Sequence, residues 1–224
     1  MKIPSLHIKS LFAALLFALA LGGASAQATV IFDSLDGTTS GGFYTIAPGG
    51  STGGPLGASF LTGASASTFN SVSVFLINPS GATTGSFSIS LFSNSGSNSP
   101  GTLLETLASP SDSILSSGEK SFTYSGLSYM LAANTEYWIE LSGANSTLGW
   151  LGTSNTTGIG VSGQYFYVNG GTFPNSSIGP QQMTVDTTSI ASAPEPSMFF
   201  LFGVSSLGAA VYAYRRGRTT LRAN

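Results

Sequence analysis

Few side chains in this sequence can carry out acid–base, nucleophilic or metal chemistry. The sequence contains no cysteine and a single histidine, His7. Between residues 27 and 193 there is also no arginine, and the only lysine is Lys120. Nucleophile–base pairs that use histidine, and zinc sites built from histidine and cysteine, are therefore excluded from this stretch. We expect no catalytic residue, no cofactor and no metal site.

Carboxylates are the remaining enzymatic option. Residues 27–193 contain eight of them: Asp33, Asp36, Glu105, Asp112, Glu119, Glu136, Glu140 and Asp186. In the segment Glu136-Tyr137-Trp138-Ile139-Glu140, strand alternation places Glu136, Trp138 and Glu140 on one face. The two glutamates would then lie about 13 Å apart at ~3.3 Å per residue, whereas glycosidase carboxyl pairs need roughly 5 to 9.5 Å. A carboxylate-dependent glycoside hydrolase would need a partner from another strand, and it is the least favoured hypothesis.

The same strand face suggests carbohydrate binding. Trp138 could offer its ring to a sugar while Glu136 and Glu140 accept hydrogen bonds from sugar hydroxyls, and Tyr165 and Tyr167 could add further contacts. The alternative interpretation is that Trp138 packs in the core or covers the edge of a sandwich, with the glutamates at the rim. Carbohydrate binding therefore stands as an alternative function.

Two further polar segments have a simple structural interpretation. Asp33 and Asp36 surround a short polar stretch, which predicts an Asx-type turn; a calcium site would need six to eight oxygens from several segments. Lys120 follows Ser117-Gly118-Glu119, which predicts a turn with a solvated charge rather than a Ser–Lys dyad.

The elements that must position these side chains are short strands. Residues 86–91 alternate strictly, so that Phe87, Ile89 and Leu91 should be buried and the intervening serines solvated. Similar segments, rich in β-branched and aromatic residues and bounded by turn residues, occur at 29–32, 43–46, 59–61, 69–77, 121–124, 136–141, 148–151, 165–168 and 183–186. Many short strands in this length predict an all-β, antiparallel β-sandwich of jelly-roll-like type over residues 27–193.

Charge excludes one large class of partners. Residues 27–193 carry a net charge of −7, from one lysine and eight acidic side chains. A nucleic-acid backbone must be neutralised by lysine or arginine, so nucleic-acid binding is excluded. Only 7% of all residues are charged, which also argues against a coiled coil or a disordered acidic tail.

The N-terminal residues 1–26 have the pattern of a signal peptide. Lys2 and Lys9 precede an apolar run at 11–21, and Ala24 and Ala26 form a small-residue cleavage site. The apolar run is shorter than the ~20 residues that span a bilayer. The sequence therefore predicts export and cleavage after Ala26 by signal peptidase.

The other end of the sequence has three parts in a fixed order. Pro194-Glu195-Pro196 is an extended spacer because both prolines disfavour helix before them. An apolar run at 198–214 can form a short transmembrane helix of about 25 Å. Arg215, Arg216 and Arg218 then keep this end, with the tail 219–224, in the cytoplasm.

This arrangement over residues 194–218 resembles the PEP-CTERM sorting signal of Gram-negative bacteria. The resemblance implies that an exosortase, a membrane transpeptidase-like enzyme, reads Pro194, Glu195 and Pro196. It implies anchoring in the inner membrane, and then a place at the cell surface or outside the cell after processing. An ordinary C-terminal membrane anchor is the alternative, and whether the helix is removed or retained stays open.

The segments 56–62, 69–77, 87–93, 100–104 and 136–141 look like the exported β-domain called choice-of-anchor R, over roughly residues 30–186. The resemblance implies a fold and an address, and it carries no catalytic signature. We therefore expect a non-catalytic exported protein of the surface or of an extracellular polysaccharide (biofilm) matrix.

Overall fold

The computed structural model describes residues 27–35, 42–49, 53–175 and 180–190, and within them the chain is built almost entirely of β-strands. The predicted signal peptide and the segment 194–218 lie outside the described residues. Thirteen strands are formed in the described part: β1 (Ala28–Asp33), β2 (Phe43–Thr45), β3 (Leu56–Leu61), β4 (Ser67–Asn78), β5 (Ser88–Asn94), β6 (Pro100–Ala108), β7 (Gly118–Ser125), β8 (Met130–Leu131), β9 (Glu136–Ser142), β10 (Gly149–Leu151), β11 (Tyr165–Val168), β12 (Gly171–Pro174) and β13 (Met183–Ser189). The one helix of this part is a short 3₁₀ turn, η2 (Asp112–Ile114).

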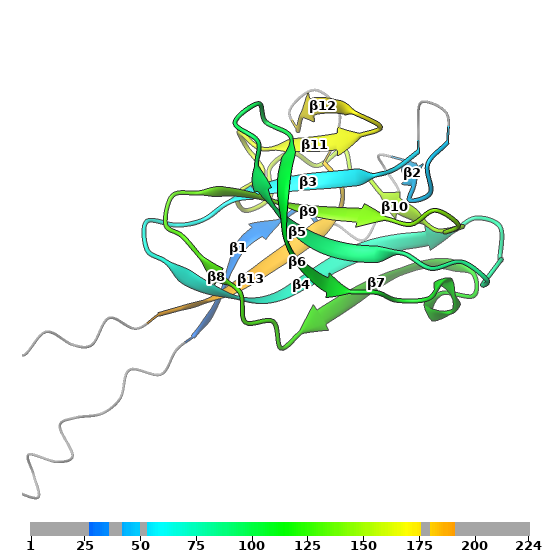
Figure 1. Ribbon diagram of the computed structural model, residues 1–224, viewed down its shortest axis with the longest axis horizontal. Coiled ribbons are helices and arrows are strands. Elements are labelled where there is room, and N and C mark those ends of the chain that lie inside the picture. Colours follow the sequence, from blue (N-terminus) through cyan, green and yellow to red (C-terminus); the bar gives the residue numbers. More distant parts are fainter. Residues whose placement is uncertain (1–26, 36–41, 50–52, 176–179, 191–224) are drawn as a thin grey trace, which may run out of the picture. The chain divides into compact units, whose positions relative to one another are not determined.

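The first sheet is organised around the long strand β4. One edge of β4 pairs with β13 and then β10, and the other edge pairs with β8 and then β7, all antiparallel. β1 extends the sheet beyond β13, and β2 extends it beyond β10 (Figure 1). The sheet therefore has seven strands.

The second sheet has six antiparallel strands in the order β12-β11-β3-β9-β5-β6. β9 lies near its centre, paired with β3 on one side and β5 on the other. β5 and β6 form a hairpin whose connection uses residues with positive φ, Gly96 and Asn98. Both residue types tolerate this conformation, so the sequence is suited to a tight reversal here.

The core lies between the two sheets. Val72, Val74 and Leu76 from β4 are fully buried, as are Ile139 and Leu141 from β9. They belong to one cluster of apolar side chains drawn from both sheets. The architecture is thus all-β and sandwich-like, with two antiparallel sheets, as the sequence predicts.

The two ends of this β-domain lie side by side. β1 and β13 pair antiparallel, with Ala28 opposite Thr188 and Asp33 opposite Thr184 (Figure 1). Asp33 also ends β1 with the predicted Asx-type turn, because its Oδ1 accepts a hydrogen bond from the Leu35 N–H at 3.0 Å. The chain therefore enters and leaves the domain at the same edge.

All ten predicted strand segments contain strand in the structure, although the predictions were incomplete. β6, β8 and β12 were missed, and β6 begins inside a stretch that is rich in turn residues. Lys120 was expected in a turn but lies in β7, exposed and 5.5 Å from the Phe122 ring centroid. Phe87, Ile89 and Leu91 are buried as expected, whereas Ser90, expected in solvent, is also buried.

Within the part of the chain that the structure describes, no helix has the length and apolar character needed to cross a membrane.

Candidate functional site

The predicted sugar-binding residues lie on the face of β9 that points away from the core. Tyr137, Ile139 and Leu141 point inward, so Glu136, Trp138 and Glu140 alternate outward. Across the sheet, Trp138 is opposite Ser59 of β3 and Phe92 of β5. The alternation predicted from the sequence is therefore correct for β9.

Trp138 nevertheless has no exposed surface. Its ring packs over Gly57 with Tyr167 and Pro100: a Cβ added to Gly57 would lie 3.2 Å from Trp138 Cε3, 3.2 Å from Tyr167 Cβ and 3.4 Å from Pro100 Cγ. The absence of a side chain at Gly57 leaves the space that the indole fills. The prediction that Trp138 is a sugar platform is therefore wrong, and the alternative interpretation, packing within the sandwich, describes it.

The indole N–H of Trp138 is the first donor in a chain of two hydrogen bonds. Trp138 Nε1 donates to Asn94 Oδ1 at 3.3 Å, and Asn94 Nδ2 donates to Glu136 Oε2 at 2.6 Å. The second carboxylate oxygen, Glu136 Oε1, is buried and has no hydrogen-bond partner. Trp138 thus fixes the orientation of the Asn94 amide, and that amide satisfies one half of the Glu136 carboxylate.

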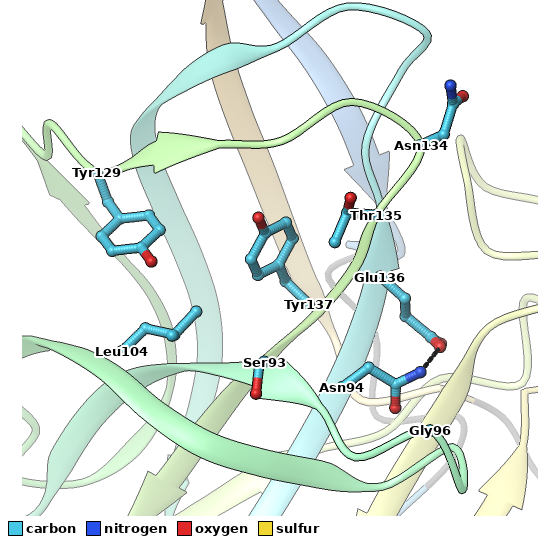
Figure 2. Close-up of a pocket in the computed structure, with 9 residues that line it drawn as sticks. All are labelled: Ser93, Asn94, Gly96, Leu104, Tyr129, Asn134, Thr135, Glu136 and Tyr137. Carbon is cyan, nitrogen blue, oxygen red and sulfur yellow. Dashed lines mark hydrogen bonds between the residues drawn. The ribbon is translucent and has the colours of Figure 1, made fainter.

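Glu136 lines a cleft of about 440 Å³ at the end of the six-stranded sheet (Figure 2). The β5–β6 hairpin, the segment before β8 and the start of β9 form its walls, which consist of Ser93, Asn94, Gly96, Leu104, Tyr129, Asn134, Thr135, Glu136 and Tyr137. Figure 2 shows Tyr129, Tyr137 and Leu104 on one side, and Asn94 facing Glu136 on the other. The cleft therefore combines an aromatic wall with a polar one.

The other predicted contacts are not lining residues of this cleft. Tyr165 and Tyr167 are half-buried on β11, two strands away from β9. Glu140 lies between Gly57 and Ser90 on the sheet face, and burial raises its pKa to about 7. Of the residues predicted to contact sugar, the structure brings only Glu136 to the cleft, with Trp138 behind it.

Sequence reasoning missed most of the cleft. Asn94 and Leu104 belong to the β5–β6 hairpin, and β6 carries no simple alternation that would have revealed it. The residue type of Asn134 is the one usable signal, because asparagine tolerates the positive φ of 48° that it adopts just before β9. Tyr129 precedes a two-residue strand, which is too short to be recognised from sequence.

The described residues do not bring together the side chains that a metal site or a two-carboxylate mechanism needs. No group of three or more His, Cys, Asp or Glu side chains that could hold a metal occurs among the described residues. Glu136 is the only carboxylate among the described residues that line the cleft. Asp112, a carboxylate outside β9, accepts hydrogen bonds from Ser146 and Thr147 in the loop between β9 and β10.

Comparison with known proteins adds no relationship. No family model matches the chain. No curated protein matches it either.

Proposed function

We propose that this protein is an exported, non-catalytic β-domain that an exosortase-type system delivers to the cell surface or to an extracellular polysaccharide matrix. The observation that carries the proposal is the sequence of the C-terminal segment, which has three parts in a fixed order: Pro194-Glu195-Pro196, the apolar run 198–214, and Arg215, Arg216 and Arg218. These parts are chemically suited to a spacer, a membrane span and a cytoplasmic stop.

The N-terminal end supports export. Residues 1–26 have a basic start, a short apolar run and the small residues Ala24 and Ala26 before Gln27. Signal peptidase would release the chain just before β1, which begins at Ala28. The domain that follows is a sandwich, which we propose to be of the jelly-roll-like class.

The arrangement of the domain is compatible with sorting from its C-terminal end. β13 ends at Ser189, five positions before Pro194. Ser189 is itself paired within the sheet, opposite Ser67 of β4. A membrane enzyme that reads Pro194, Glu195 and Pro196 would therefore act on a short connection next to a folded domain, and removal of residues 198–224 would leave all thirteen strands intact.

The mass of the mature protein in its native host tests this proposal. We expect the surface protein to begin at Gln27 and to lack residues 198–224. Changing Pro194, Glu195 and Pro196 together to alanine should leave a full-length C-terminus in the inner membrane. Changing Thr219, Thr220 and Leu221 to alanine is the matched control and should not alter processing. A wild-type surface protein that retains Asn224 would contradict sorting and leave a plain anchor.

Carbohydrate binding is the second candidate function, carried by the same exported domain. The aromatic and polar walls of the cleft at Glu136 favour it (Figure 2). The contact through Trp138 that the sequence predicts does not support carbohydrate binding, because the Trp138 ring is buried.

A further inference from the structure

The charge of the cleft restricts what it can bind. The described residues that line it include no lysine or arginine and one carboxylate, Glu136. Lys120 is the only basic side chain among the described residues, and it lies on β7, in the other sheet. An anionic ligand would meet an acidic side chain and no compensating cation. The charge of the described lining therefore disfavours an anionic ligand.

The apolar wall offers one aromatic ring to a ligand. The Tyr137 ring is stacked on Phe60 with centroids 5.9 Å apart, and its hydroxyl accepts a hydrogen bond from the Ala132 N–H at 3.0 Å. Tyr137 is thus largely committed to the protein. Tyr129 is only half-buried, and with Leu104 it leaves apolar surface facing the cleft (Figure 2). Such a surface suits the C–H face of a sugar ring.

The polar wall has unused hydrogen-bonding capacity. Glu136 Oε1 is buried without a partner, a state that costs free energy until a donor reaches it. Glu136 lines the cleft and is only partly buried as a residue, so a ligand seated there can offer the carboxylate the missing donor. Asn134 stands exposed at the rim, where its amide can both donate and accept.

We propose that this cleft binds an uncharged sugar ring of a polysaccharide. The ring stacks on Tyr129, one of its hydroxyls donates to Glu136, and Asn134 contacts it at the rim. Trp138 is a positioning residue, which holds Asn94 and through it Glu136. The volume of about 440 Å³ lies within the ~300–1,000 Å³ typical of small-ligand sites. The inference rests on the carbohydrate-binding candidate and not on the sorting signal.

A glycan array tests the ligand class. The full chain, purified in mild detergent, is applied to neutral gluco-, manno-, galacto- and xylo-oligosaccharides, to uronic-acid oligosaccharides, and to amino-sugar oligomers with free amines. We expect binding to at least one neutral series and none to the uronic acids. No binding to any neutral series, or stronger binding to the acidic or amine-bearing series, would overturn the proposal.

Glu136→Ala tests the residue. It should weaken binding to the neutral sugar about tenfold or more, because a hydrogen bond to a charged acceptor is lost. Glu119→Ala is the matched control: it removes the same charge from an exposed position on β7 and should leave affinity unchanged. Thermal unfolding of each variant shows that the fold is retained. Binding that survives Glu136→Ala overturns the proposal.

Substitution of each tryptophan, Trp138 and Trp150, by phenylalanine tests the positioning role of Trp138. Trp138→Phe keeps an aromatic ring but removes the N–H that holds Asn94, and it should weaken binding about threefold to tenfold. Trp150→Phe is the matched control, because Trp150 is equally buried and its Nε1 donates to the Gln182 carbonyl at 2.9 Å in the other sheet. Trp150→Phe should lower stability and leave affinity unchanged. Equal losses of affinity in the two variants would show that Trp138 acts only through folding.

Discussion

Asp112, between β6 and β7, and Glu136 and Glu140, on β9, are acidic side chains that the fold removes wholly or partly from water. Asp112 is fully buried and fully paired. Its Oδ1 accepts from Ser146 Oγ at 2.9 Å, and its Oδ2 accepts from the Thr147 N–H at 2.6 Å and from Thr147 Oγ1 at 3.0 Å. On β9, by contrast, Glu136 has one oxygen without a partner, and burial raises the pKa of Glu140.

This difference distinguishes Asp112, whose carboxylate has a structural role, from Glu136, whose carboxylate can still accept a hydrogen bond from a ligand. The donors around Asp112 come from the loop between β9 and β10, so the carboxylate joins that loop to η2, and because Asp112 is fully buried it is not accessible to a ligand. Glu136 and Glu140 have only part of their hydrogen-bonding or solvation needs met by the protein. Substitutions should therefore destabilise the fold strongly at Asp112 and weakly on β9.

Asp112→Asn should have the largest effect. The amide keeps one acceptor oxygen but turns an N–H₂ group towards donors that belong to Ser146 or Thr147. We expect the free energy of unfolding to fall by about 2 to 4 kcal/mol, measured by urea denaturation. Glu119→Gln, on the exposed part of β7, should change it by less than about 0.5 kcal/mol. Similar small effects for both variants would remove the distinction between the two regions.

Gly85, next to Asp112, and Gly57, next to Trp138 of β9, show how tightly the same two regions are packed. A Cβ at Gly85 would overlap the Asn145 carbonyl oxygen and the Asp112 carboxylate, and the backbone there cannot move aside cheaply. Gly85→Ala should therefore cost about 1 to 3 kcal/mol. At Gly57 the closest atoms belong to the side chains of Trp138 and Tyr167, at 3.2 Å. Gly57→Ala should cost less than about 1 kcal/mol, and the reverse order of the two losses in thermal unfolding would contradict this comparison.

Much of the fold was readable from local pattern. β9 and β11 show the alternation or aromatic content that a half-buried strand requires, and their bounds were close to those observed. β6 was not readable, because it is largely exposed and begins with Pro-Gly. The burial of Ser90 was not readable either, and the burial of Trp138 was only one of two interpretations that the sequence allowed. Around Trp138 the neighbours at Gly57 are Tyr167 of β11 and Pro100 of β6, and the periodicity of β9 alone cannot reveal residues from other strands.

The site was predictable only as a strand face. The sequence correctly places Glu136, Trp138 and Glu140 together, because a strand has a period of two. It cannot show that Asn94, more than forty positions away, lies between Trp138 and Glu136. That contact is set by the pairing of β5 with β9, which places Phe92 opposite Trp138.

Glu140→Gln should change how stability depends on pH. The pKa of Glu140 is raised from 4.5 to about 7 in the folded protein, so the folded state holds this proton more tightly than the unfolded chain. Its contribution to stability is therefore present at low pH and is lost as pH rises from about 4.5 to about 7. The full shift corresponds to at most about 3 kcal/mol, and because the side chain is partly exposed we expect on the order of 1 kcal/mol.

Urea denaturation between pH 4 and pH 8 measures this effect. Relative to the wild type, Glu140→Gln should gain stability with rising pH and then level off above pH ~7. Glu105→Gln, at an exposed position on β6, is the control and should follow the wild-type profile. A variant that loses stability relative to the wild type as pH rises would contradict the unfavourable burial of the Glu140 carboxylate.

Glu136→Gln should have the smallest effect on stability and the most specific effect on function. The glutamine carbonyl can still accept the hydrogen bond from Asn94, at the cost of its charge-assisted strength, while the variant no longer buries a half-paired carboxylate. These changes oppose each other, so we expect the free energy of unfolding to change by less than about 0.5 kcal/mol. An amide N–H₂ at the position of Oε1 cannot accept a hydrogen bond from a sugar hydroxyl, so binding to the neutral glycan should still weaken. A stability loss as large as that of Asp112→Asn would mean that Glu136 is as fully satisfied as Asp112, and the cleft would then have no acceptor to offer a ligand.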